Sequence, residues 1–157
     1  MKKFFKKILI IAMIVTTCIS VGVRTTWAYD QKKVVEEINR ERQSHHLPSF
    51  KLNSELSYIA QKKVKDMMQK QYWAHQSPNG EMIWDLMSKA DFTYQAAGEN
   101  LAKGFTDDTQ MVKAWMESPA HRANILSDQF SEIGLSELSG NFQGKDASIV
   151  SLVFIKP

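Results

Sequence analysis

The sequence predicts an α+β fold, because helical patterns fill its first part and strand patterns fill its last part. Up to about residue 126, apolar residues recur every three or four positions, which is the period of an amphipathic helix. From Ile133 onwards the period changes, and the run Ile149–Ile155 is almost continuously apolar. We therefore expect a single domain in which helices pack against a sheet.

Two helices are predicted at the start of the domain. The first covers residues 29–46 and ends before Pro48, since the residue preceding a proline disfavours helical geometry. The second begins near Asn53, a favourable N-cap residue, and carries Glu55 in its first turn. It ends near residue 71, after an apolar stripe with helical spacing.

The middle of the chain alternates turns and helices. A Ser-Pro-Asn-Gly turn at 77–80 precedes a third helix around 82–87. Residues 98–104 are expected to form a short irregular or extended piece. Asp107 or Asp108 is expected to cap a fourth helix, which carries an apolar stripe ending at Trp115 and Met116.

Two strands are predicted at the end of the chain. After a helical turn at 119–126, the apolar residues 133–138 indicate one strand and Ile149–Ile155 the other. A polar loop that contains Gly140 and Gly144 is expected to join them.

Residues 1–28 differ in character from the rest of the sequence. A lysine-rich start is followed by an apolar run and by the small residue Ala28, which is the pattern of a secretory signal peptide cleaved after that residue. If it is retained, the segment would serve as one N-terminal anchor, although its apolar run is short of the roughly 20 residues that a span needs. We expect the domain at 29–157 to have no stable transmembrane span after cleavage.

Removal of the predicted signal peptide changes the charge and the cysteine content. The leader carries five of the 20 basic residues and none of the 17 acidic ones, so the remaining chain has a net charge near −2. This balance provides no basic field for binding nucleic acid. The only cysteine, Cys18, also lies in the leader, which excludes disulfides, cysteine-bound zinc and a cysteine nucleophile in the remaining chain.

Two of the four histidines could carry chemistry. His45 and His46 lie at a polar helix end and are expected to be solvated. His75 directly precedes the turn and could be a packing residue or a ligand. His121 follows Ser-Pro in the first turn of a short helix, where the positive helix end favours a neutral imidazole. A neutral imidazole can bind a metal or act as a base, but a corner histidine bonded to a carbonyl fits this position equally well.

Glu99 and Asn100 lie in the sequence GENLAKG. The preceding glycine would allow a close approach of the backbone, which would suit a site, whereas Glu99 could equally be a loop carboxylate that pairs with a lysine. Asn100 and Asn124 could tie loops together through hydrogen bonds to the backbone.

Together these residues resemble a known family. Five motifs follow one another along about residues 34–136: NRER (39–42), AHQSPNG (74–80), GENLAKG (98–104), WMESPAHRANIL (115–126) and IG (133–134). Their order and spacing are similar to those of the CAP superfamily, and within it to the bacterial SCP-like extracellular proteins. The resemblance implies a PR-1-like three-layer α-β-α sandwich with a central antiparallel sheet. It also implies an open cleft with a tetrad of histidines and glutamates.

The resemblance assigns three members of that tetrad to His75, Glu99 and His121. Animal and plant members carry the fourth, a glutamate, three residues after the helix tryptophan, where this chain has Ser118. The adjacent Glu117 could replace it only if the helix end were distorted. We expect Glu99, Asn100, Ser118 and Glu117 to support the cleft.

The expected chemistry is weak, pH-dependent binding of Zn²⁺ by His75 and His121, with Glu99 orienting a histidine or accepting a proton from water. No reaction-specific motif is present, so we favour a monomeric binding module outside the cell or in the cell envelope. Its ligand would be a metal, a lipid, a peptide or a cell-wall component. The alternatives are a weak Zn²⁺-dependent hydrolase that uses the same three residues, with Glu99 as its candidate catalytic group, and a purely structural hydrogen-bond cluster.

Overall fold

The computed structural model describes residues 30–157, and the predicted signal peptide lies outside this range. The elements are α1 (Gln31–Ser44), β1 (Lys51–Leu52), α2 (Ser54–Lys70), α3 (Ile83–Ser88), β2 (Ala96–Lys103), α4 (Asp108–Glu117), α5 (Pro119–Ile125), β3 (Glu132–Phe142) and β4 (Lys145–Lys156). None of the helices in the described range is long and apolar enough to cross a bilayer.

The four strands form one sheet in the order β1-β3-β4-β2. The three long strands are antiparallel, as predicted. The short strand β1 was not predicted, and it adds a parallel pairing with Glu132 and Ile133 at one edge. Its two residues are exposed and form no periodic pattern that could reveal a strand. At the opposite edge, β2 pairs with β4 along its whole length.

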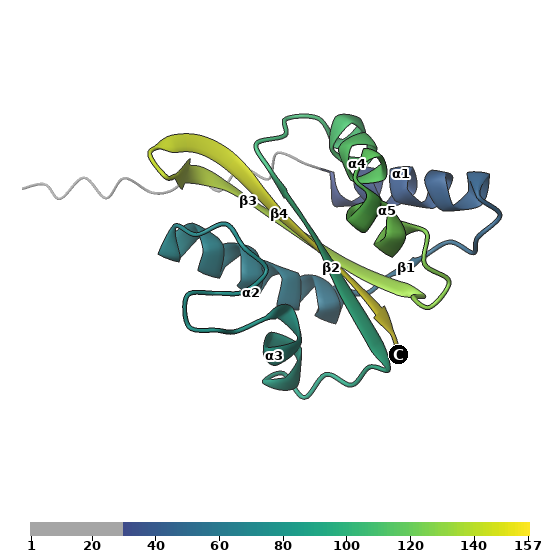
Figure 1. Ribbon diagram of the computed structural model, residues 1–157, viewed down its shortest axis with the longest axis horizontal. Coiled ribbons are helices and arrows are strands. Elements are labelled where there is room, and N and C mark those ends of the chain that lie inside the picture. The colour runs from purple at the N-terminus through teal and green to yellow at the C-terminus, as the bar shows by residue number, and fades with distance from the viewer. Residues whose placement is uncertain (1–29) are drawn as a thin grey trace, which may run out of the picture.

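Helices cover both faces of the sheet, which gives the expected three layers (Figure 1). Helices α1, α4 and α5 lie on one face, and α2 and α3 lie on the other. Strand β4 is buried on both sides, because alternate residues enter the two cores. Residues Val150, Leu152 and Phe154 face the first layer, and Ile149, Val153 and Ile155 face the second.

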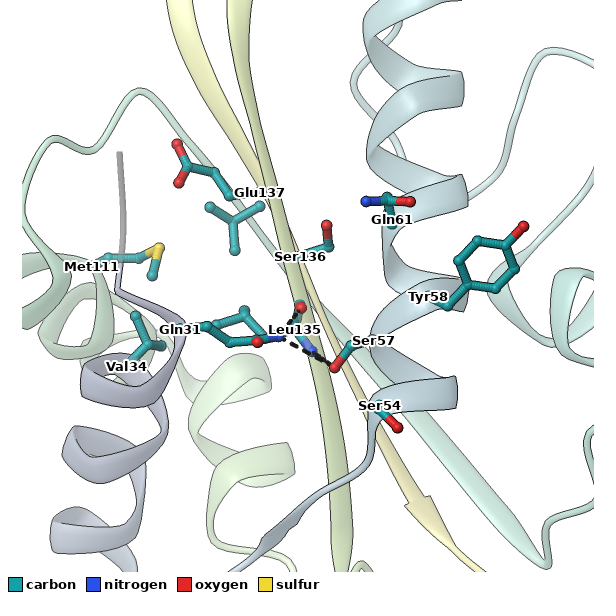
Figure 2. A pocket seen from close by; sticks show the side chains of 11 residues that line it. Gln31, Val34, Ser54, Ser57, Tyr58, Gln61, Met111, Leu135, Ser136 and Glu137 are labelled. Atoms are coloured by element: carbon teal, nitrogen blue, oxygen red, sulfur yellow. Dashed lines mark hydrogen bonds between the residues drawn. The ribbon is translucent and has the colours of Figure 1, made fainter. Parts of the chain in front are cut away.

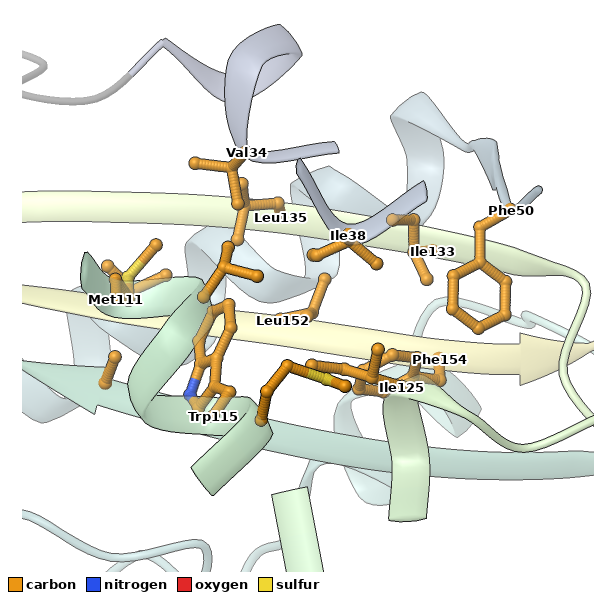
Figure 3. Close-up of a cluster of buried hydrophobic side chains, with 14 of the residues drawn as sticks. Val34, Ile38, Phe50, Met111, Trp115, Ile125, Ile133, Leu135, Leu152 and Phe154 are labelled. Carbon is orange, nitrogen blue, oxygen red and sulfur yellow. The ribbon is translucent and has the colours of Figure 1, made fainter. Parts of the chain in front are cut away.

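The larger core surrounds Trp115 of α4 (Figure 3). This indole is 2% exposed, and its Nε1 donates a hydrogen bond of 3.1 Å to the carbonyl of Leu101 on β2. Phe154 of β4 packs edge-on against Phe50 and stacks on Phe130, with centroid distances of 5.6 and 5.7 Å. Aromatic packing therefore joins β4 to the segments that carry Phe50 and Phe130, and the hydrogen bond of Trp115 joins α4 to β2.

Side-chain caps begin the three longest helices. Asp30 accepts a hydrogen bond from the backbone N–H of Lys32 at the start of α1. The predicted cap Asn53 accepts one from Leu56, and of the two candidates for α4 it is Asp107 that forms the cap. These bonds satisfy N–H groups that have no partner inside a helix.

The structure refines two predictions about the strands. Residues 98–104 were expected to form a short irregular or extended piece, and the extended alternative holds, because most of them belong to the eight-residue strand β2. Gly140 was placed in a loop but lies within β3, and the turn is formed by Gln143 and Gly144 with positive φ angles of 52° and 82°. The part of the β3–β4 hairpin near its turn is largely exposed to solvent, so its residues are mostly polar. This polar composition is also typical of a loop, which explains the wrong assignment.

Arg42 connects the end of α1 to the end of α5. Its side chain is 1% exposed, and its guanidinium lies 3.6 Å from the centroid of the Phe50 ring. It donates hydrogen bonds of 2.7 Å to the carbonyls of Pro48, Ile125 and Ser127. A planar group with several donors can hold three carbonyls from different segments at once, which fixes the helix that carries His121.

Gly134 sets the distance between α2 and the sheet. A Cβ atom at this position would lie 2.3 Å from the backbone carbon of Leu56 and 2.4 Å from the nitrogen of Ser57. At Gly140, the nearest atom to such a Cβ would be the sulfur of Met68 at 3.7 Å, which is an ordinary contact. Helix α2 therefore rests on the bare backbone of β3 at Gly134.

We expect Gly134→Ala to lower the free energy of unfolding by about 3 kcal/mol, because the added methyl group would displace backbone rather than a flexible side chain. Gly140→Ala, in the same strand, should change it by less than about 1 kcal/mol. Urea unfolding monitored by tryptophan fluorescence measures both. Equal effects of the two substitutions would show that the close approach at Gly134 does not limit stability.

Candidate functional site

The predicted site residues gather around β2, the edge strand opposite β1. His75 lies in the segment between α2 and α3, and His121 lies on α5 in the other helical layer. Glu99 and Asn100 are consecutive residues of β2, so their side chains point to opposite faces of the sheet. One strand therefore contacts both layers.

Glu99 fixes the ring of His75. The Nδ1 atom of His75 lies 2.8 Å from Oε2 of Glu99, and Ser151 on β4 donates a hydrogen bond of 2.9 Å to Oε1. An ionised carboxylate can only accept, so Nδ1 carries a proton in this arrangement. The Glu99 side chain is 3% exposed and that of His75 is 49% exposed. A buried carboxylate thus orients an imidazole that reaches solvent.

Asn100 fixes the backbone of His121. Its side chain is fully buried, and its Nδ2 donates a hydrogen bond of 3.0 Å to the carbonyl of His121. The predicted bond to the backbone is therefore present for Asn100, and its Oδ1 also accepts a hydrogen bond of 2.8 Å from the side chain of Asn124. A Cβ atom on Gly98 would lie 3.1 Å from both Asn124 and Phe130, so glycine permits this close packing.

Burial lowers the pKa of His121, and the charge of a protonated His75 lowers it further. A lowered pKa agrees with the neutral imidazole that the sequence suggested. The main cause is desolvation, however, and not the positive end of the helix. His121 therefore favours the form that can bind a metal or accept a proton.

The turn predicted at 77–80 is present, and hydrogen bonds within it stabilise it. Ser77 is buried, and its Oγ accepts a bond of 3.1 Å from the backbone N–H of Glu81. The N–H of Gly80 donates to the carbonyl of Ser77 at 2.9 Å, and Gly80 has a φ angle of 86°. The segment that carries His75 is thus anchored at its C-terminal side.

Lys63 contacts the segment that carries His75 and was not among the residues predicted from the sequence. It lies on α2 with 2% exposure and donates hydrogen bonds to the carbonyl of His75 at 2.5 Å and to the hydroxyl of Tyr72 at 3.2 Å. Its position in the inward stripe, between Ala60 and Met67, is a signal that could have revealed it.

Glu117 and Ser118 take other roles. Glu117 is exposed at the end of α4 and lies 3.8 Å from the ammonium of Lys113. Ser118 stands between α4 and α5 with extended backbone angles, and its side chain makes no capping bond. Across residues 30–157, no three or more histidine, cysteine, aspartate or glutamate side chains are grouped so as to hold a metal ion.

The sequence model of the Cysteine-rich secretory protein family, CAP, matches residues 35–151, which is more than half of the chain. The chain belongs to the CAP family. The matched range contains no cysteine, so the membership rests on the other residues of the domain.

Bacterial relatives agree with this assignment. The Bacillus subtilis protein YkwD, described as uncharacterized, is 44% identical over 105 residues, which cover 67% of this chain and 41% of YkwD. An extracellular SCP-domain protein from Bacillus anthracis is 26% identical with a TM-score of 0.69, over 80% of this chain and 40% of that one. This chain therefore spans about two fifths of the length of each of these relatives.

The fold is also found in more distant proteins. An outer surface protein of Borrelia burgdorferi has a TM-score of 0.71 at 22% identity, with 80% of this chain and 90% of that one covered. A likeness at this level of identity concerns the fold of the CAP domain.

The CAP domain also contains a cavity away from the histidines. It has a volume of about 460 Å³ and lies between α1, α2 and β3 (Figure 2). Val34, Met111, Leu135 and Val150 give it apolar walls. Gln31 donates hydrogen bonds to the carbonyl of Leu135 at 2.5 Å and to Ser57 at 3.2 Å. The size and the mixed lining fall within the range of small-molecule sites.

The lowered pKa of His121 predicts that the CAP domain loses stability in mild acid. The unfolded chain, in which the pKa is near its ordinary value of 6.5, binds this proton more tightly than the folded chain. The free energy of unfolding should therefore fall as the pH drops below 6.5, and His121→Gln should reduce the fall. Urea unfolding of the parent and the variant, at about pH 7.5 and about pH 5.5 with a chelator present, measures this fall in the free energy of unfolding. An unchanged pH dependence in the variant would contradict the prediction.

Proposed function

We propose that this CAP domain is an extracellular binding module whose His75 and His121 bind Zn²⁺ weakly. The observation that carries the proposal is the 2.8 Å contact between Nδ1 of His75 and Glu99. This contact leaves Nε2, the usual metal-binding atom of such a histidine, directed away from the carboxylate. His121 adds a second imidazole that favours its neutral form.

An extracellular location is supported by two observations. The Bacillus anthracis relative is described as an extracellular protein, and the Borrelia burgdorferi protein as an outer surface protein. The lysine-rich and apolar pattern of residues 1–28 is typical of secretion.

The donor set fits a site with two protein ligands. Imidazole nitrogens suit Zn²⁺, and an ordered carboxylate behind a ligating histidine is a common arrangement. With two ligands from the chain, the remaining positions would be left for water or for an anionic group of the bound partner. Bound Zn²⁺ would supply a Lewis acid at the cleft. The chain's own contribution is to fix the ring of His75 through Glu99 and the backbone of His121 through Asn100, from two consecutive residues of β2.

Binding is favoured over hydrolysis because of the surroundings of Glu99. A general base must reach the proton that it removes. Both oxygens of Glu99 already accept hydrogen bonds, from His75 and Ser151, and its side chain is 3% exposed. A hydrolase would require this carboxylate to leave those partners. Its contacts instead suit the orientation of His75.

We expect calorimetric titration of residues 29–157 with Zn²⁺ at neutral pH to give saturable binding near one ion per chain. His75→Ala and His121→Ala should each weaken the affinity at least about tenfold, because each removes one of two ligands. His46→Ala, at the exposed end of α1, is the matched control and should stay within about twofold of the parent.

A parent chain that binds no Zn²⁺ would contradict the metal proposal. Equal losses in all three variants would show that the metal binds surface histidines non-specifically. Binding that survives in both site variants would place the metal elsewhere.

The cavity beside α1 supports a second candidate, the binding of a small apolar ligand between α1 and α2. Figure 2 shows Gln61 and Tyr58 of α2 on one side and Val34 and Met111 on the other. Apolar walls with a few fixed polar groups are typical of sites for such ligands.

We expect lauric acid, used as the probe, to stabilise the domain in a concentration-dependent manner, by about 2.7 kcal/mol at 100 times its dissociation constant. Gln61→Trp should block the cavity and remove this effect, whereas Lys65→Trp, exposed one turn later on α2, should retain it. Thermal unfolding measures both variants. No stabilisation of the parent, or equal stabilisation of both variants, would exclude this probe from the cavity.

A further inference from the structure

Lys63 is a buried cation next to the proposed site. It is 2% exposed, which is rare for a lysine, because an ammonium group loses strong hydration on burial. Its side chain extends from α2, and its Nζ donates hydrogen bonds to the carbonyl of His75 at 2.5 Å and to the hydroxyl of Tyr72 at 3.2 Å. The ammonium therefore contacts the segment that carries His75 at two points.

The contacts of Lys63 continue to Asp66. The hydroxyl of Tyr72 donates a hydrogen bond of 2.7 Å to Oδ2 of Asp66, and the ammonium of Lys70 lies 2.6 Å from the other oxygen of that carboxylate. Asp66 and Lys63 lie on the same helix, so Tyr72 is held between two residues of α2. This tether fixes the start of the His75 segment, while the turn at Ser77 fixes its end.

Lys63 also acts on Glu99 through its charge. Burial lowers the pKa of Lys63 below its usual range, and the nearby carboxylates of Glu99 and Asp66 partly counteract this effect. Glu99 is itself almost fully buried, and a nearby positive charge offsets part of the cost of burying its carboxylate. That carboxylate accepts the hydrogen bond from Nδ1 of His75.

We propose that Lys63 is a positioning residue, which holds the backbone of the His75 segment so that the imidazole keeps its contact with Glu99, carries its proton on Nδ1 and directs Nε2 away from that carboxylate. It contacts His75 through the backbone carbonyl, and therefore does not touch the bound ligand itself. The expected effect on Zn²⁺ affinity rests on the proposed function, whereas the effect of Lys63 on the orientation of His75 is independent of it.

The test compares Lys63→Met with Lys65→Met. Methionine preserves most of the length and apolar volume of the lysine but removes the charge and the donors. Lys65 is exposed on the same helix and receives the same substitution. Nitrogen-15 NMR of His75, without metal and at one fixed pH, reports which ring nitrogen carries the proton. Zn²⁺ calorimetry and circular dichroism are recorded on the same samples.

We expect Lys63→Met to lose the single Nδ1–H form of His75 while the chain stays folded, and to weaken Zn²⁺ binding about 10- to 100-fold, the range for residues that orient a metal ligand. Lys65→Met should match the parent in both measurements. If Lys63→Met keeps the Nδ1–H form of His75, the proposal is overturned and Lys63 serves packing alone.

A second variant keeps the test decisive if Lys63→Met fails to fold. Tyr72→Phe retains the aromatic ring but removes the hydroxyl that links Lys63 to Asp66, so the Nδ1–H form should become mixed. An unchanged His75 in this variant would then overturn the proposal. If the parent binds no Zn²⁺, the metal function fails, and the NMR comparison alone decides the role of Lys63.

Discussion

The register between β2 and β4 is the constraint on which the rest of the site depends. Glu99 lies opposite Val153, and Asn100 lies opposite Leu152. Because side chains alternate along a strand, this register directs Glu99 to the layer of α2 and Asn100 to the layer of α5. A shift by one residue would exchange the two faces and separate both side chains from their partners.

The two histidines are held in different ways by these neighbouring residues. Glu99 contacts the imidazole ring of His75, whereas Asn100 contacts the backbone carbonyl of His121. One contact therefore sets a ring orientation, and the other sets the position of a helix. The two helical layers contribute these histidines from opposite faces of β2, which is an edge strand of the sheet.

The buried polar groups around β2 have a physical cost that apolar residues would avoid. Glu99, Asn100, Ser151 and Lys63 are each at least nine-tenths buried, and the hydrogen bonds between them and their neighbours offset the loss of hydration. A fully connected polar network rigidifies the groups that it contains. This network adjoins both histidines, whereas most other buried side chains of residues 30–157 are apolar.

The sequence by itself determined the α+β class and the helix cap at Asn53, and it narrowed the cap of α4 to Asp107 or Asp108, because periodicity and capping residues are local signals. Its motifs also singled out His75, Glu99, Asn100 and His121 as candidate site residues. Only the tertiary structure decided that GENLAKG is an edge strand, that Glu117 is exposed, and that Lys63 lies behind His75. The decisive contacts join residues far apart in the chain: His75 and Glu99 are separated by 24 positions, and Glu99 and Ser151 by 52. Contacts at such separations depend on the packing of the sheet and its two helical layers, which no local pattern specifies.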